Sequence, residues 1–236
     1  MNFNYFSITF WFDIFENHKD LLEIFQKEFS EEFNNINIMQ YTDNLVAPII
    51  TSINNEKRTN FSFSQINFQY NMDNVDIHDF ANFNNACLKF YDILTSNNIL
   101  IKHSAILVNG ELIDENALET ISKKFLKDNI SDDDFVDVSL KIGKKHEELF
   151  YKIVSVLNKK QLKLPKKTDD KGRFVPIPLI SWNETQIENE IIEISHEIND
   201  KYSFDNTKDY HTTEFYLNKM LYILGEDIKE DINNLF

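Results

Sequence analysis

The sequence predicts an α+β fold made of two antiparallel sheet-and-helix lobes. Three observations predict it: polar and apolar residues alternate in several segments, other segments have apolar residues at helical spacing, and a polar run at 128–134 separates two such sets. A chain of 236 residues can bury one sizeable core or two small ones. We therefore expect residues 1–128 and 129–236 to form two lobes, or one continuous domain.

The first lobe is predicted to have a split βαβ, or ferredoxin-like, order of elements. Ser7–Phe15 alternates as a half-buried strand, with Trp11 on the face opposite Ile8 and Phe10. The segments that we expect to follow are a helix from Asn17 to Phe33, strands at 36–41, 46–53 and 61–70, a helix from Asp76 or Asp79 to Leu94, and a strand at 99–108. A shift in the alternation predicts a bulge near Ser64 and Gln65, and Asn109-Gly110 predicts a turn.

The second lobe is predicted to contain a hairpin, a further strand and a long C-terminal helix. Asp114 is suited to cap a helix that runs to Leu126 and leads into the polar run. The later elements that we expect are strands at 136–142 and 149–157, a strand at 174–182 interrupted by Pro176 and Pro178, a strand at 192–198, and a helix at 213–233.

Some of these segments resemble a known family. The order of strands and helices in the first half, the strand DVSLKIG and the closing EIIEISHEINDKYSF followed by a helix are similar to an uncharacterised, sporadically distributed bacterial family of soluble α+β proteins of similar length. The resemblance implies the fold class but no mechanism.

The charge is distributed unevenly along the chain. The formal net charge is −15, yet residues 123–173 carry 14 Lys and Arg against 9 Asp and Glu. The candidate binding residues of this stretch are Lys159, Lys160, Lys163, Lys166, Lys167, Lys171 and Arg173. Two interpretations stay open: a solvated loop tip with the turn residues Asp169, Asp170 and Gly172, or a mobile arm that contacts phosphate or an acidic partner.

No sequence motif indicates a catalytic, metal or cofactor site. There is no glycine-rich phosphate loop and no H-E-x-x-H pair, and we expect the single cysteine, Cys87, to be buried on a helix. We expect His196 to be buried and His211 to cap the last helix. The abundance of Asn is interpreted as a codon bias. Trp11 and Trp182 are either core residues or a contact patch.

These observations favour a non-catalytic macromolecular interaction protein. The composition and the resemblance suggest a component of a bacterial or phage conflict system, in defence or immunity. One alternative is a nucleic-acid or nucleotide-phosphate binder that uses the basic stretch at 159–173, and another is an acidic mimic of DNA. With one cysteine, no signal-like leader and no long apolar run, we expect a soluble cytoplasmic protein with a protein partner or a second copy of itself, and no membrane.

Overall fold

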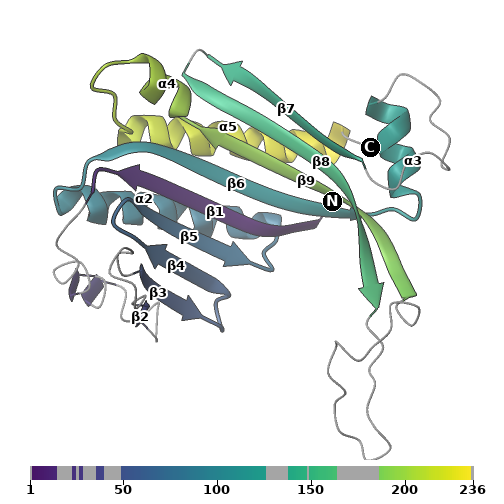
Figure 1. The fold of residues 1–236 in the computed structure, drawn as a ribbon, viewed down its shortest axis with the longest axis horizontal. Helices are drawn as coiled ribbons and strands as arrows, with labels where there is room; N and C mark the ends of the chain where they lie inside the picture. Colours follow the sequence, from purple (N-terminus) through teal and green to yellow (C-terminus); the bar gives the residue numbers. More distant parts are fainter. Residues whose placement is uncertain are drawn as a thin grey trace, which may run out of the picture. The chain divides into compact units, whose positions relative to one another are not determined.

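The computed structural model describes residues 2–14, 23–24, 27–28, 36–39, 49–125, 138–147, 149–163 and 186–234. Their nine strands belong to one sheet with the order β2-β3-β4-β5-β1-β6-β9-β8-β7 (Figure 1). The strands are β1 (Asn2–Phe12), β2 (Ile36–Met39), β3 (Ile49–Asn54), β4 (Thr59–Phe63), β5 (Asn67–Asp73), β6 (Ile101–Ile113), β7 (Ser139–His146), β8 (Phe150–Lys163) and β9 (Gln186–Asn199). The helices are the short 3₁₀-helix η1 (Ile77–Asp79), α2 (Phe80–Ser96), α3 (Ala117–Phe125), α4 (Lys201–Asn206) and α5 (Glu214–Asn234). This mixture confirms the predicted α+β class.

The chain divides into two compact units. Unit 1 contains Glu111–Lys141 and Ser155–Ile194, and unit 2 contains Asn2–Gly110, Ile142–Val154 and Ser195–Phe236. The divisions fall within β6, β7, β8 and β9, so these four strands each contribute residues to both units. The boundary predicted at residue 128 lies outside the described residues.

The core of unit 2 is an aromatic layer between the sheet and α2. In β1 the predicted alternation is confirmed, because Phe6, Ile8, Phe10 and Phe12 are all buried. The Phe6 ring lies 5.5 Å from Phe83 of α2, and Phe68 of β5 lies 4.8 Å from Phe90 of the same helix. The strand ends earlier than predicted, since Ile14 is 68% exposed.

The segment 61–70 differs from the prediction of one bulged strand. It contains the end of β4, a tight connection and the beginning of β5, and the two strands pair antiparallel with Phe63 opposite Phe68. The Ser64 backbone N–H donates to the Asn67 carbonyl at 2.8 Å, and the Ser64 hydroxyl donates to Asn67 Oδ1 at 2.7 Å. A hairpin turn therefore explains the shift in alternation. The chain reverses between β4 and β5, and the apolar side chains of β5 then lie on the same face of the sheet as those of β4.

Helices α2 and α5 form where the apolar stripes predict them. Asp76 caps η1 at the start of the first helical region, and Cys87 is buried in α2 as expected. Close approach between α2 and α5 requires Gly225, since a Cβ at this position would lie 2.9 Å from Cε1 of Phe80. The predicted cap His211 is wrong: the hydroxyl of Thr213 accepts from the Tyr216 N–H instead.

The turn predicted at Asn109-Gly110 is not formed. Both residues lie inside β6, and Gly110 is buried. The sheet places β6 between β1 and β9, so ladder pairing on both sides outweighs the local turn preference of this dipeptide.

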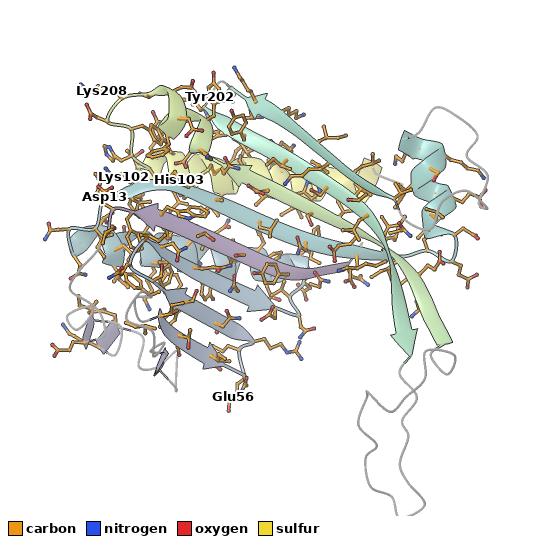
Figure 2. The ribbon with its side chains drawn as sticks, viewed as in Figure 1. Asp13, Glu56, Lys102, His103, Tyr202 and Lys208 are labelled. Atoms are coloured by element: carbon orange, nitrogen blue, oxygen red, sulfur yellow. The ribbon has the colours of Figure 1, made fainter. Side chains whose placement is uncertain are left out.

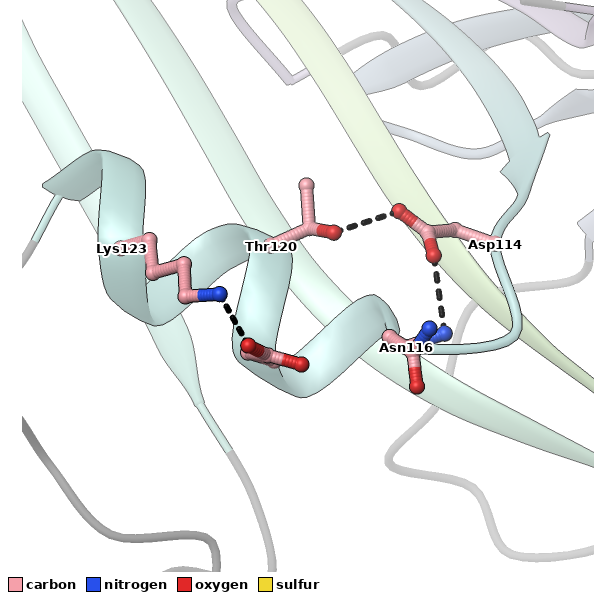
Figure 3. A network of polar contacts seen from close by, with 5 residues as sticks. Asp114, Asn116, Thr120 and Lys123 are labelled. Atoms are coloured by element: carbon pink, nitrogen blue, oxygen red, sulfur yellow. Dashed lines mark hydrogen bonds and ion pairs between the residues drawn. The ribbon is translucent and has the colours of Figure 1, made fainter.

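Within unit 1, Asp114 lies just before α3 and its side chain contacts the start of the helix (Figure 3). Its carboxylate accepts from the Asn116 backbone N–H at 2.8 Å and from the Thr120 hydroxyl at 2.7 Å. Lys123 and Glu119 form an ion pair one turn apart on the same helix. The carboxylate thus binds the N–H of Asn116, the residue immediately before α3, so Asp114 anchors the start of the helix from two positions further out than the N-cap position.

The predicted hairpin of the second half is confirmed, with longer strands. A tight turn around Glu147, which has a positive φ of 50°, joins β7 to β8. Strand β8 continues to Lys163 rather than ending at residue 157, and β9 begins at Gln186 rather than at residue 192. The predicted strand at 174–182 lies outside the described residues.

Candidate binding surface

The face of the unit 2 sheet opposite α2 carries a continuous set of polar side chains. Since alternate residues of a strand point to opposite faces, the residues between the buried positions of β1 share this side with their partners on β5 and β4. We call it the polar face and define it as Tyr5, Ser7, Thr9, Trp11, Asn60, Ser62, Asn67, Gln69, Asn71 and Asp73. Figure 1 shows α2 behind the strands, and none of the described helices of unit 2 lies in front of β1, β4 and β5.

Hydrogen bonds fix the side chains at the centre of the polar face. The Oδ1 atom of Asn71 accepts from the Tyr5 hydroxyl at 2.8 Å, from the Ser7 hydroxyl at 2.7 Å and from Gln69 Nε2 at 3.1 Å. Its Nδ2 atom donates to Asn60 Oδ1 at 2.7 Å. Both polar atoms of the Asn71 amide are therefore used, and the amide connects three strands.

The network continues to one carboxylate. Asn60 Nδ2 donates to Asp73 Oδ2 at 3.1 Å, and Asp73 stands opposite Tyr5 in the sheet register. Burial is the main reason why the pKa of Tyr5 lies above its ordinary value, with a smaller contribution from the negative charge of Asp73. The phenol therefore stays protonated at neutral pH and remains a donor.

An aromatic stack lies at the end of β1. The Trp11 indole stacks on His103 of β6 with ring centroids 4.4 Å apart and an angle of 22° between the planes. Phe204 of α4 lies 5.1 Å from the same imidazole. We call Trp11, His103 and Phe204 the aromatic end. Figure 2 shows His103 and Lys102 beside Asp13 at this end of unit 2, where Lys102 and Asp13 form an ion pair of 2.9 Å.

His103 is held in its neutral form by its surroundings. Burial between the two rings lowers its pKa most, and the nearby ammonium of Lys201 lowers it further against the opposing effect of Asp205. Its Nδ1 atom is buried and has no hydrogen-bond partner among the described residues. A neutral imidazole suits stacking on an indole, and the half-buried Trp11 leaves part of this stack accessible.

A second polar cluster in unit 2 is centred on a buried carboxylate. The buried carboxylate of Asp200 accepts from the Ser104 backbone N–H at 2.7 Å, from the Thr212 hydroxyl at 2.6 Å and from the Tyr210 hydroxyl at 2.9 Å. Burial raises the pKa of Asp200, and the three hydrogen bonds oppose this rise. The cluster joins β6 to the residues before α5. With three donors on its two oxygens, the carboxylate has a structural role.

The basic stretch is only partly described, and its described part belongs to a strand. Lys159, Lys160 and Lys163 lie in β8, and Lys159 forms an ion pair with Glu193 of β9 within unit 1. The side chains of Lys160 and Lys163 are not described. The predicted residues outside the described part of the chain are Lys166, Lys167, Lys171, Arg173 and Trp182. The structure places Trp11 at the aromatic end of unit 2 and Lys159, Lys160 and Lys163 in the part of β8 that belongs to unit 1.

Other predicted features have local structural roles. His196 is buried on the core side of β9, as its alternation predicts. Among the described residues no group of three His, Cys, Asp or Glu side chains is arranged to hold a metal ion. Within the same residues, no helix has both the length and the apolar character needed to cross a membrane.

Sequence reasoning missed the polar face, although a signal for it exists. Asn67, Gln69, Asn71 and Asp73 are polar at every second position, which is the period of one strand face. The abundance of Asn was interpreted as codon bias, but Asn60 and Asn71 have specific partners. No sequence pattern indicated that these residues face Tyr5 and Ser7.

Comparisons with known proteins give no further indication of function. No protein-family model matches the chain, and no curated protein matches its sequence.

Proposed function

We propose that this chain is a non-catalytic macromolecular interaction protein that binds a protein partner through its polar face and aromatic end. The observation that carries the proposal is the hydrogen-bond network around Asn71, which fixes the side chains before a partner arrives. Because ordering of side chains opposes association, a preordered surface loses less free energy when it binds. Tyr5 and Trp11 add the residue types that contribute most strongly to protein interfaces.

The charges favour a protein partner over a nucleic acid. Asp73 ends the network, in a chain whose net charge is −15, while the charge of Asp13 at the aromatic end is balanced by Lys102. Clustered cations are needed to displace the counterions of a phosphate backbone, so carboxylates at this surface oppose such binding. The basic stretch supports nucleic-acid binding less well, since Lys159 is already paired with Glu193.

The cellular setting that we propose is the bacterial cytoplasm, in a defence or immunity system of bacteria or phages. This part of the proposal is supported by the single cysteine, by the amino-acid bias and by the family resemblance of the strand DVSLKIG and the closing segment. A partner encoded by such a system is the expected binding target.

The test is capture of the partner from native host lysate with wild-type protein and matched surface variants. Thr9 and Ser62 lie on either side of Gln69, on β1 and β4, and neither belongs to the Asn71 network. Thr9→Lys and Ser62→Lys add a long charged side chain to the polar face, whereas Tyr222→Lys changes an exposed position of α5 and serves as the control.

The expected result is one stoichiometric protein that survives nuclease treatment, binds wild-type protein and the Tyr222→Lys variant, and is lost from both polar-face variants. Circular dichroism checks that all variants are folded. Equal capture by the Thr9→Lys variant and the wild type would reject the polar face as the site. Loss of all retained protein on nuclease treatment would favour nucleic-acid binding, and capture of a DNA-binding protein that DNA displaces would favour DNA mimicry.

A further inference from the structure

The aromatic end contains a titratable ring that is covered from two sides. His103 of β6 lies between Trp11 of β1 and Phe204 of α4, at centroid distances of 4.4 and 5.1 Å. Since β6 is an inner strand, between β1 and β9, pairing in the sheet holds the backbone of His103 in place. A rearrangement around the imidazole must therefore come from the side chains that cover it.

The enclosure leaves one nitrogen of the imidazole without a hydrogen bond. The Nδ1 atom of His103 is buried, and none of the described residues donates to it or accepts from it. In the neutral imidazole, Nδ1 can be the nitrogen that carries no proton. Protonation places an N–H donor at this atom, and a buried donor of a charged group is costly when it has no acceptor. The closed stack therefore suits the neutral ring and opposes the imidazolium.

The charged groups around the ring do not compensate for a positive imidazole. On α4, Lys201 and Asp205 form an ion pair of 3.7 Å. Lys102 of β6 and Asp13, which follows β1, form a second ion pair of 2.9 Å. Each carboxylate is thus matched by an ammonium group, and the two pairs have no net charge. Burial and the Lys201 ammonium accordingly lower the pKa of His103, and Asp205 opposes them only in part.

The two rings that cover His103 are not held equally. Trp11 is half-buried within β1, whereas Phe204 belongs to the six-residue helix α4 and is 38% exposed. The Ser203 hydroxyl donates to the Leu149 carbonyl at 2.7 Å, which holds the backbone of α4 while the Phe204 side chain can turn outward. An indole attracts a cation over its face. Trp11 is therefore the ring that stays on a charged imidazole, and Phe204 is the ring that can leave it.

We propose that protonation of His103 in mild acid opens the aromatic end. The Phe204 side chain turns away, water reaches the Nδ1–H of the imidazolium, and Trp11 remains stacked on it. The opened aromatic end carries one more positive charge and has lost one of its three rings. The consequence for a partner rests on the binding function proposed above, because a partner that fits the closed aromatic end would meet a different surface. The opening itself belongs to the protein alone, so it can be tested without a partner.

The experiment is a pH titration of the full-length protein by NMR, without a partner, between about pH 8 and about pH 4.5. Carbon-13 labels in the His, Phe and Trp rings report the protonation of His103 and its nuclear Overhauser contacts with Trp11 and Phe204. His103→Phe keeps a ring that cannot titrate, and Phe204→Ala removes the outer cover. His78→Gln is the matched control, because it removes an exposed imidazole from η1. Far-UV circular dichroism checks that each protein is folded at each pH.

The expected result is loss of the contact between His103 and Phe204 with the same midpoint as the titration of His103, while the contact with Trp11 persists. The His78→Gln variant shows the same loss, and the His103→Phe variant keeps its contact with Phe204 at every pH. In Phe204→Ala the midpoint of His103 rises by at least about half a pH unit, because water then reaches the ring.

Three results would overturn the proposal. One is a contact between His103 and Phe204 that survives full protonation of His103. The second is acid unfolding of the protein before His103 titrates. The third is an unchanged midpoint of His103 in Phe204→Ala. All three concern the protein alone, so they are distinct from a failure to capture a partner, which bears on the proposed function.

Discussion

The Asp200 cluster allows a quantitative prediction of stability. Asp200→Ala removes the acceptor of three hydrogen bonds at the junction of β6, β9 and the residues before α5. Two of the donors are buried, namely the Ser104 backbone N–H and the Thr212 hydroxyl. The Tyr210 hydroxyl belongs to a half-buried residue and can turn to water.

The magnitude follows from the donors left without a partner. Each buried donor that loses its acceptor costs about 1–3 kcal/mol of unfolding free energy. The Thr212 hydroxyl can turn to the Ser104 hydroxyl, which is 3.3 Å away, so its share is reduced. We therefore expect Asp200→Ala to lower the free energy of unfolding by about 3 kcal/mol, a large part of the about 5–15 kcal/mol typical of a domain.

Urea unfolding followed by far-UV circular dichroism at pH 7 measures this loss. Asp205→Ala is the matched control, because this exposed α4 carboxylate pairs only with Lys201, at 3.7 Å, in the described structure, and its loss is expected to cost less than about 1 kcal/mol. If Asp200→Ala and Asp205→Ala have the same unfolding free energy, the Asp200 cluster does not stabilise the fold as argued.

The same carboxylate predicts a pH dependence. Burial raises the folded-state pKa of Asp200 above the ordinary value of 3.8, so the folded protein holds this proton more tightly than the unfolded chain does. The part of the stability that comes from tighter proton binding at Asp200 is therefore fully present below pH 3.8 and is lost as the pH rises through the folded-state pKa, whereas the hydrogen bonds to the carboxylate remain. Asp200→Asn cannot titrate, so the difference in unfolding free energy between wild type and this variant should fall as the pH rises from 4. If the unfolding free energy of the wild type instead rose relative to that of Asp200→Asn with increasing pH, the pKa of Asp200 would not be raised in the folded state.

Three further predictions concern other contacts of unit 2. His103→Phe keeps a ring in the stack but removes an imidazole whose pKa is lowered from 6.5 in the folded protein. The wild type should therefore lose unfolding free energy relative to this variant as the pH falls from 7.5 to 5.5, and the same pH dependence in both proteins would contradict the prediction. Lys152 of β8 and Asp227 of α5 form an ion pair with side chains only 14% and 16% exposed, so Lys152→Met should cost about 2–4 kcal/mol in urea unfolding, and adding Asp227→Leu should restore most of it. Gly225→Ala gains helix propensity of about 1 kcal/mol but forces the Phe80 ring to move, so thermal unfolding should show a net loss of stability rather than a gain.

The helices were predictable because their stripes are long and regular. Phe83, Cys87, Phe90 and Leu94 repeat over the length of α2, and every one of them is buried. The strand boundaries were less predictable, because local signals compete with pairing in the sheet. The Asn109-Gly110 pair predicted a turn, yet the neighbouring strands keep it in β6.

The candidate surface could be predicted only in fragments. The alternation placed Trp11 opposite the core face of β1 and suggested a contact patch, but it gave no indication that His103 stacks on it. Tyr5 and Asn71 are 66 residues apart, and their hydrogen bond depends on the register of β1 with β5. Such a register is set by packing of the whole sheet, so one sequence cannot supply it.

The most direct test of the proposed binding surface is hydroxyl-radical footprinting of the protein alone and in complex with the partner captured from lysate. Tyr5 and Trp11 report on the polar face, whereas Phe215 and Tyr222 of α5, which are 68% and 69% exposed, are internal controls. We predict that the partner lowers the oxidation rates of Tyr5 and Trp11 and leaves those of Phe215 and Tyr222 unchanged. Protection of Phe215 and Tyr222 with unchanged oxidation of Trp11 would place the partner on α5 and contradict the proposal.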